Sequence, residues 1–319
     1  MPPHALAPMD GVTDHVYRDL MTSRARPGAV GYVVSEFLRV TDRPMSERVI
    51  RRSCPEVKRG GVTPSGTPVM LQLLGGQPEP LAETARNAIR EGAFGIDLNF
   101  GCPAKLVNRH DGGASLLRSL DRLERIVAAV RAAVPAERTV SVKVRLGWES
   151  HDEVVAIARA AERGGASYLT VHGRTKLEMY GPPADWDAIG RARRAVSIDV
   201  VANGDLNSAR SLADCEAASG CTRFMLGRGP MGRPSLVVGD AEDGPLDDEG
   251  ELRLLADLLL DYVERIRAVW DSEHGELARV KQWLSLARAA NPAVRPLFDR
   301  VKRLADATEL RAVLAEAAS

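Results

Sequence analysis

Short apolar segments alternate with longer amphipathic segments along most of the chain. The apolar segments are rich in Val, Ile, Leu and Tyr, and they predict strands at His4–Ala7, Tyr32–Ser35, Val69–Leu73, Gly95–Leu98, Val140–Val144, Tyr168–Val171, Asp199–Ala202 and Arg223–Leu226. Between them, apolar residues recur every three or four positions and predict helices that include Glu79–Glu91, Asp121–Ala133, Asp152–Arg163, Ala184–Ala195 and Ser208–Ala218.

The strand segments read as continuous apolar runs, which is typical of parallel strands covered on both faces. Eight strand–helix units in succession predict an α/β fold of the (β/α)8 TIM barrel type. A doubly wound sheet is the alternative, but it usually has fewer strands and often carries a GxGxxG turn. No such turn follows the first strand here, so we favour the barrel.

Polar or conformationally special residues follow nearly every predicted strand. They are Pro8, Met9, Asp10, Glu36, Gln72, Asn99, Cys102, Lys143, Arg145, His172, Arg174, Asn203, Gly204, Asp205, Gly227 and Arg228. In a TIM barrel the active site lies at the carboxyl ends of the strands. We therefore expect these residues to share one site.

The composition changes after the last predicted strand. Residues 240–251 carry seven acidic and no basic residues, which predicts a solvated linker at 239–251 between a barrel (1–238) and a helical domain (252–319). Helical periodicity covers Leu252–Trp270, Leu277–Ala290, Pro296–Leu304 and Glu309–Ala317. Residues 276–303 hold seven Lys and Arg against two acids, either as a solvated face or as a phosphate-binding cluster. Trp283 lies among leucines at helical spacing, so we expect it in a core.

Composition and charge narrow the class of protein. The 43 basic and 43 acidic residues give zero net charge, so a nucleic acid could be held only by a local patch. Four cysteines without a CxxC pair make a zinc site or disulfide scaffold unexpected, and we expect no metal. No apolar run approaches a membrane span, and the start of the chain lacks signal-peptide features. A cytoplasmic protein without membrane contact is the expectation.

Three groups of residues carry candidate chemistry. Cys102 lies in a Gly-Cys-Pro turn, where a thiol could donate a proton, act as a nucleophile, or simply be buried. Lys143 and His172 would suit an electron-rich ring such as a flavin, which gains negative charge on reduction, or could be an ordinary surface cation and a structural histidine. The Gly227-Arg228 pair could bind a phosphate or merely form a tight turn.

In order along residues 5 to 232, the strings LAPMDGVTD, SEF, VMLQLLG, DLNFGCPAKLVN, SVKVRLGW, VHGRT, ANGD and MLGRG resemble the tRNA-dihydrouridine synthases. The tail ARVKQWLSLARAANPAVRPLFDRVKRL, with TPSGTPV and RLGWES, is most similar to the bacterial C-type branch, which acts on uridine 16. The resemblance implies an FMN-dependent, NADPH-reduced oxidoreductase that binds tRNA between its barrel and its helical domain, and we expect a monomer.

The resemblance also implies roles for individual residues. Cys102 matches the proton donor of the family. The matches to FMN contacts are Pro8, Met9, Asp10, Gln72, Lys143, His172, Asn203, Gly204, Asp205, Gly227 and Arg228. The matches to contacts with tRNA or its target base are Arg39, Asn99, Lys176, Tyr180, Arg279, Lys281 and Lys302. Two alternatives stay open: another FMN barrel oxidoreductase acting on a small molecule, and a tRNA-binding protein without catalysis.

Overall fold

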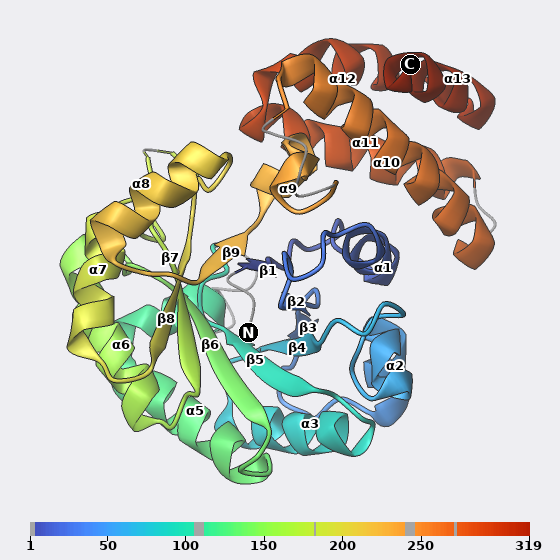
Figure 1. The fold of residues 1–319 in the computed structure, drawn as a ribbon. Coiled ribbons are helices and arrows are strands. Elements are labelled where there is room, and N and C mark those ends of the chain that lie inside the picture. Colours follow the sequence, from blue (N-terminus) through green and yellow to red (C-terminus); the bar gives the residue numbers. More distant parts are fainter. Residues whose placement is uncertain (1–3, 105–111, 182, 240–245, 271–272) are drawn as a thin grey trace.

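The computed structural model describes residues 4–104, 112–181, 183–239, 246–270 and 273–319. Eight parallel strands form a closed ring, because β2 pairs with both β1 and β4 while β9 pairs with β1 and β8 (Figure 1). The strands are β1 (His4–Leu6), β2 (Tyr32–Val34), β4 (Val69–Leu74), β5 (Gly95–Asn99), β6 (Thr139–Arg145), β7 (Tyr168–His172), β8 (Asp199–Asn203) and β9 (Phe224–Leu226). The predicted TIM barrel and its eight strands are confirmed. A short extra strand, β3 (Leu38–Arg39), pairs with the end of β4.

Helices surround the ring, and a bundle of further helices lies beside it (Figure 1). Those of the barrel are α1 (His15–Ser23), α2 (Glu47–Ser53), α3 (Pro78–Arg90), α5 (Leu120–Ala133), α6 (Val154–Arg163), α7 (Trp186–Ala195), α8 (Ala209–Ser219) and the short α9 (Arg228–Gly232). The bundle, called the helical part below, consists of α10 (Asp248–Trp270), α11 (Glu273–Ala290), α12 (Arg295–Val301) and α13 (Ala307–Ala318).

Apolar and polar side chains alternate along β6, although its sequence is rich in valine. Val140, Val142 and Val144 of β6 are fully buried in the large core between the ring and its helices. Ser141 and Lys143 alternate with them and therefore face the inside of the ring. A second, small core inside the ring contains residues such as Tyr32, Met70 and Met225. The reading of β6 as a continuous apolar run was therefore wrong, because its inner face is polar.

The predicted boundary between linker and helical part also needs correction. Residues 240–245 of the expected linker lie outside the described residues, but α10 already begins at Asp248 instead of Leu252. Acidic residues in a first turn interact favourably with the positive end of the helix dipole, so an acidic stretch can open a helix. Glu251 is itself buried, and its carboxylate accepts hydrogen bonds from Ser235.

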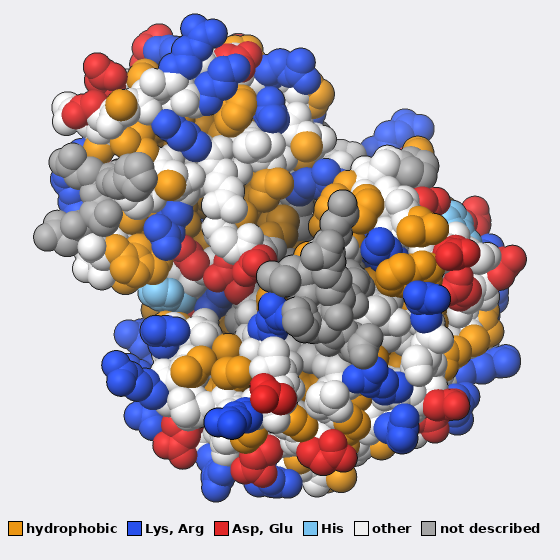
Figure 2. Space-filling model, turned by 180° about the vertical axis from the view of Figure 1, so that it is seen from behind, with side chains coloured by type: hydrophobic (Ala, Val, Ile, Leu, Met, Phe, Trp, Pro, Cys, Tyr) orange, Lys and Arg blue, Asp and Glu red, His pale blue; other side chains and the backbone are white. Residues whose placement is uncertain are grey.

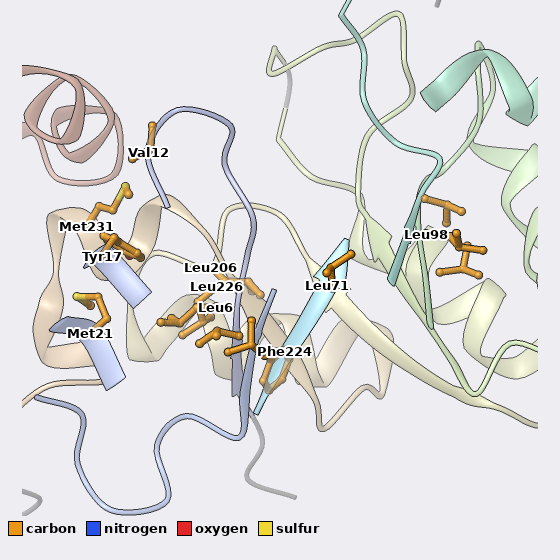
Figure 3. Packing of buried hydrophobic residues seen from close by; sticks show 14 of the residues in the cluster. Leu6, Val12, Tyr17, Met21, Leu71, Leu98, Leu206, Phe224, Leu226 and Met231 are labelled. Carbon is orange, nitrogen blue, oxygen red and sulfur yellow. The ribbon is translucent and has the colours of Figure 1, made fainter. Parts of the chain in front are cut away.

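Trp283 of α11 joins the helical part to the barrel. Its side chain is fully buried, and its ring packs edge-on against two tyrosines. The ring centroids are 4.8 Å apart for Tyr17 of α1 and 5.1 Å apart for Tyr262 of α10. Its indole N–H donates to the carbonyl of Met231 in α9 at 3.1 Å. Figure 3 shows Tyr17 and Met231 close to each other at this junction. The expectation that Trp283 belongs to a core is confirmed, and this core fixes α11 across the carboxyl end of the ring.

Candidate active site

A cavity of about 480 Å³ opens at the carboxyl ends of the strands. Its wall includes all eleven residues expected to contact FMN, together with Cys102, Asn99 and Tyr180. The register explains this gathering, because the inward-facing position at the end of each parallel strand reaches the same end of the ring. Asn99 of β5 pairs with Lys143 of β6, and His172 of β7 pairs with Asn203 of β8.

A chain of buried hydrogen bonds leads from the barrel interior to the backbone of Cys102. Asp97 is fully buried and accepts hydrogen bonds from Gln72 Nε2 at 2.7 Å and from Ser141 Oγ at 2.6 Å. Gln72 Oε1 in turn accepts from Asn99 Nδ2 at 2.8 Å. Asn99 Oδ1 then accepts from the amides of Gly101 and Cys102, both at 3.0 Å. This chain fixes the amide orientation of Gln72 and Asn99 and holds the turn that carries the thiol.

Lys143 and His172 place two nitrogen groups at the floor of the cavity. Burial, reinforced by Arg145, lowers the pKa of Lys143 to about 8, while its ammonium donates to Asn203 Oδ1 at 3.1 Å. Burial and the cations around it, first Lys143, lower the pKa of His172 well below its usual value, so its imidazole is neutral at pH 7. His172 Nδ1 is buried and makes no hydrogen bond to any described residue. The floor therefore offers a positive charge and an unsatisfied ring nitrogen.

The turn after β8 has a constrained backbone. Gly204 has φ +119°, and a side chain there would meet the Cβ of Ala184 at 3.0 Å. Asp205 adopts φ +56°, and its carboxylate accepts from Arg174 at 2.6 Å and from the amide of Ala184 at 2.9 Å. Arg228 lies 3.6 Å from the same carboxylate. Asp205 thus ties down two arginines and the turn, while the lack of a side chain at Gly204 lets this turn pack closely against Ala184.

Cys102 lines the cavity wall and is half-buried. Burial, with a smaller contribution from the carboxylate of Asp10, raises the pKa of Cys102 above its ordinary value. The group is therefore a protonated thiol at neutral pH, which can donate a proton but is a poor nucleophile.

Residues 174–181, called the rim segment, follow β7, and Tyr180 within this segment lines the cavity. Arg145 donates to the carbonyls of Thr175 and Met179 at 2.9 and 2.7 Å, which holds both ends of the segment. Tyr180 is 58% exposed, yet its ring lies 5.3 Å from the guanidinium of Arg145 and 5.8 Å from that of Arg228. An aromatic ring over the mouth of a charged cavity can stack on a flat ligand.

The remaining residues expected at tRNA lie outside the cavity wall. The Nζ of Lys176 lies 4.6 Å from the centroid of the Trp148 ring, and Arg39 is half-buried in β3. Arg279 donates to Asp14 at 2.9 Å, Lys281 to the carbonyl of Leu304 at 2.6 Å, and Lys302 to Asp299 at 2.5 Å. On the side shown in Figure 2, Lys and Arg side chains are spread over barrel and helical part instead of forming one patch.

Sequence reasoning missed the contribution of α11 to the cavity. Gln282, Ser285 and Leu286 of this helix line the wall opposite the strand ends. Nothing local in the sequence signals this, because the position of α11 depends on the distant packing of Trp283. Asp97 and Ser141 were also missed, although their spacing of two from Asn99 and Lys143 placed them on the same inner face.

The residues present fit a flavin. A tricyclic ring needs apolar groups against its faces and hydrogen-bonding groups at its pyrimidine edge. Ala7, Met9 and Met225 provide apolar groups in the cavity wall. Lys143 can neutralise the charge that this edge gains on reduction, and the unsatisfied His172 Nδ1 needs a partner. Arg228 and Gly227 lie at the end of β9, where TIM barrels often bind phosphate.

Among the residues that the structure describes, no three His, Cys, Asp or Glu side chains gather as a set that could hold a metal ion. Within the same ranges, no helix combines the length and apolarity needed to span a bilayer.

Comparison with known proteins identifies the family. Residues 5–318 match the family model described as dihydrouridine synthase (Dus). The chain belongs to this family. It is therefore a flavin-dependent oxidoreductase, and the resemblance drawn from its motifs is confirmed.

Individual relatives cover nearly the whole chain. The tRNA-dihydrouridine(16) synthase of Ralstonia nicotianae is 45% identical over 98% of this chain and 95% of its own length. The tRNA-dihydrouridine(16) synthase of Salmonella typhimurium is 41% identical, with 96% of each chain covered. Among solved structures, histamine dehydrogenase from Rhizobium sp. 4-9 has a TM-score of 0.54 at 14% identity, covering 73% of this chain and 45% of that chain. The last similarity concerns the fold alone.

Proposed function

We propose that this protein is a cytoplasmic, monomeric enzyme that reduces the C5=C6 bond of uridine 16 in the D-loop of tRNA. FMN is the cofactor and NADPH the reductant. The observation that supports this most is that Cys102 and all eleven residues expected at FMN line one cavity, in a chain 45% identical to a synthase named for position 16. The residues proposed to contact tRNA or its target base are Arg39, Asn99, Lys176, Tyr180, Arg279, Lys281 and Lys302.

The reduction adds one hydride and one proton across the double bond. When bound and reduced, the flavin supplies the hydride, which goes to the electron-poor C6 of uracil. Negative charge then develops at C5, and the Cys102 thiol neutralises it by donating its proton, leaving a thiolate that water reprotonates. The raised pKa of Cys102 suits this role, because the thiol holds its proton until C5 becomes basic. Lys143 would stabilise negative charge on the bound cofactor, and Asn99 holds the turn that carries the thiol.

The target base must leave its stack to reach the cavity, and the D-loop lowers the energetic cost of this step because its bases are not in a continuous helix. Tyr180 lies where it can stack on the displaced base. The cations of the helical part would contact phosphates, which fixes the position of the RNA without reading its sequence.

The purified protein and an unmodified tRNA transcript test this proposal. The protein should show a flavin absorption spectrum, and incubation with NADPH should add the mass of two hydrogen atoms at uridine 16, mapped by mass spectrometry of nuclease fragments. A protein that neither carries nor takes up flavin would refute the reaction. A mass gain at another uridine would refute only the position.

A further inference from the structure

His151 lies outside the cavity and joins two loops through both of its ring nitrogens. Its Nδ1 lies 2.7 Å from Asp185 Oδ2, and its Nε2 lies 2.9 Å from Glu178 Oε1. His151 belongs to the loop after β6, whereas Glu178 lies in the rim segment and Asp185 caps α7. The imidazole of His151 thus contacts the chain on both sides of Tyr180, at Glu178 before it and at Asp185 after it.

The second oxygen of each carboxylate already has a donor. Glu178 Oε2 accepts from the amide of Thr175 at 2.7 Å, and Asp185 Oδ1 accepts from the amide of Ala188 at 2.8 Å. The carboxylates are therefore held in place and point their remaining oxygens at the ring. A neutral imidazole has one N–H and would turn a lone pair toward the other carboxylate. Only the imidazolium can donate to both.

Among the residues that the structure describes, the other charged groups near His151 come from α7 and from its own loop. Arg191 of α7 donates to the carbonyl of His151 at 3.4 Å and pairs with Asp152. Glu149 belongs to the same loop, and Glu153 is engaged by three amides of that loop. Burial alone would lower the pKa of His151, but its hydrogen bonds to Glu178 and Asp185 outweigh burial and raise it above 6.5.

The connection reaches the cavity through the rim segment. The amides of Lys176 and Leu177 donate to the carbonyls of Gly147 and Trp148 at 2.9 and 3.1 Å, so the segment packs along the His151 loop. Tyr180 follows Glu178 by two residues and lines the cavity beside Arg145 and Arg228. The contacts between His151 and the cavity wall thus run through the rim segment and Tyr180, and His151 itself does not line the cavity.

We propose that His151 is a positioning residue: its imidazolium cross-links Glu178 and Asp185 and thereby holds Tyr180 over the cavity, so that deprotonation loosens substrate capture. The proposal rests on the proposed function in that Tyr180 receives the substrate base. Because the protonated form is the one that both carboxylates stabilise, the cross-link is complete below pH 6.5 and is lost as pH rises through the raised pKa of His151.

Steady-state kinetics with tRNA across this pH range test the proposal. In the wild type, KM should rise about three- to tenfold with pH, while kcat changes far less. His151→Gln should show the high KM at every pH, and His151→Arg, which keeps the charge and the donors, should show a low KM with a flatter profile. Lys143, with its pKa of about 8, titrates in the same range, but its effect is present in every variant. A wild-type KM profile shared by His151→Gln would overturn the proposal.

Two further comparisons test whether the effect of His151 passes through Tyr180. Glu124→Gln breaks an ion pair with Arg163 at 2.6 Å on the outer wall, where Glu124 is about as exposed as His151, and should change nothing. In a Tyr180→Ala background, His151→Gln should have little additional effect, because its consequence passes through Tyr180. Additive effects of the two substitutions would overturn this route.

Hydrogen exchange tests the cross-link independently of activity. After correction for intrinsic rates, the amides of Thr175 and Lys176 should lose protection in the wild type as pH rises, and should be poorly protected at all pH values in His151→Gln. Equal protection in both proteins would overturn the proposal even if tRNA reduction is confirmed. If instead tRNA is not reduced, these protection values still decide whether the cross-link exists, so the two proposals fail separately.

Discussion

The barrel mouth and the helical part both border the cavity, but they hold their charged groups in different ways. At the mouth, Lys143 is half-buried, is fixed by the ladder between β6 and β7, and donates to Asn203 inside the cavity. In the helical part, Lys281 is half-buried on α11 and Lys302 is exposed just after α12, and both donate to groups of their own bundle. The first arrangement presents charge to a ligand in a fixed geometry, whereas the second requires a ligand to compete with existing partners.

This difference separates chemistry from capture. Backbone ladders fix the reacting groups, so their geometry is set before any ligand arrives and supports transition-state stabilisation. Cations near the protein surface are screened by salt, which suits reversible contact with phosphates. Substitutions at the mouth should therefore reduce the rate of reaction, and substitutions in the helical part should reduce binding or its dependence on salt.

The largest effect is expected at the mouth. Cys102→Ala should reduce dihydrouridine formation by about 10²- to 10⁴-fold, which is the usual loss when a general acid is removed. Flavin absorbance and tRNA affinity should stay at the wild-type level, because the substitution removes the thiol but keeps the amide that Asn99 holds. Single-turnover oxidation of the reduced enzyme by tRNA measures the step directly. Unchanged turnover would show that another group donates the proton.

The junction between the two regions should be the next most sensitive place. Trp283→Ala leaves a cavity between Tyr17, Tyr262 and Met231, and truncation of a buried Trp costs about 3–5 kcal/mol of stability. Because this packing holds α11 against the cavity, tRNA affinity should fall as well. Chemical denaturation and tRNA binding measure the two consequences.

Trp270→Ala is the matched control for this substitution. Trp270 also belongs to the helical part but is 36% exposed, so its loss should cost far less stability. If both substitutions destabilise the protein equally, the junction does not depend on the Trp283 core.

The two regions also differ in how far the sequence predicts them. Residues at the mouth follow short apolar strands, and a parallel ring brings every strand end to the same opening, so Lys143, His172 and Asn203 could be placed together from the sequence. The prediction that the strands are apolar on both faces was wrong inside the ring. Hydropathy does not predict that Asp97 and Ser141 are buried there, because their burial depends on the hydrogen bond between them.

The helical part is less predictable, because its place depends on contacts distant in sequence. Its helices follow from periodicity, yet nothing local shows that Gln282 faces the cavity or that Arg279 pairs with Asp14, 265 residues away. The acidic start of α10 was read as linker because charge density favours solvation, whereas Glu251 is buried against Ser235. Local composition could not reveal that partner.

The smallest effect is expected from Lys281 and Lys302 of the helical part, and it should appear in the salt dependence of binding. Lys281→Ala with Lys302→Ala should weaken tRNA binding modestly and lower the slope of log affinity against log salt by up to about two, because each phosphate contact contributes about one. Because Lys281 and Lys302 already have hydrogen-bond partners, each gains less from a phosphate contact, so the change in slope should fall below this limit.

Arg300→Ala, which breaks a pair with Glu316 on α13, serves as the control. Since all three side chains are cations of one bundle, an equal change in slope from Arg300→Ala would mean that general charge, and not the position of Lys281 and Lys302, attracts the RNA.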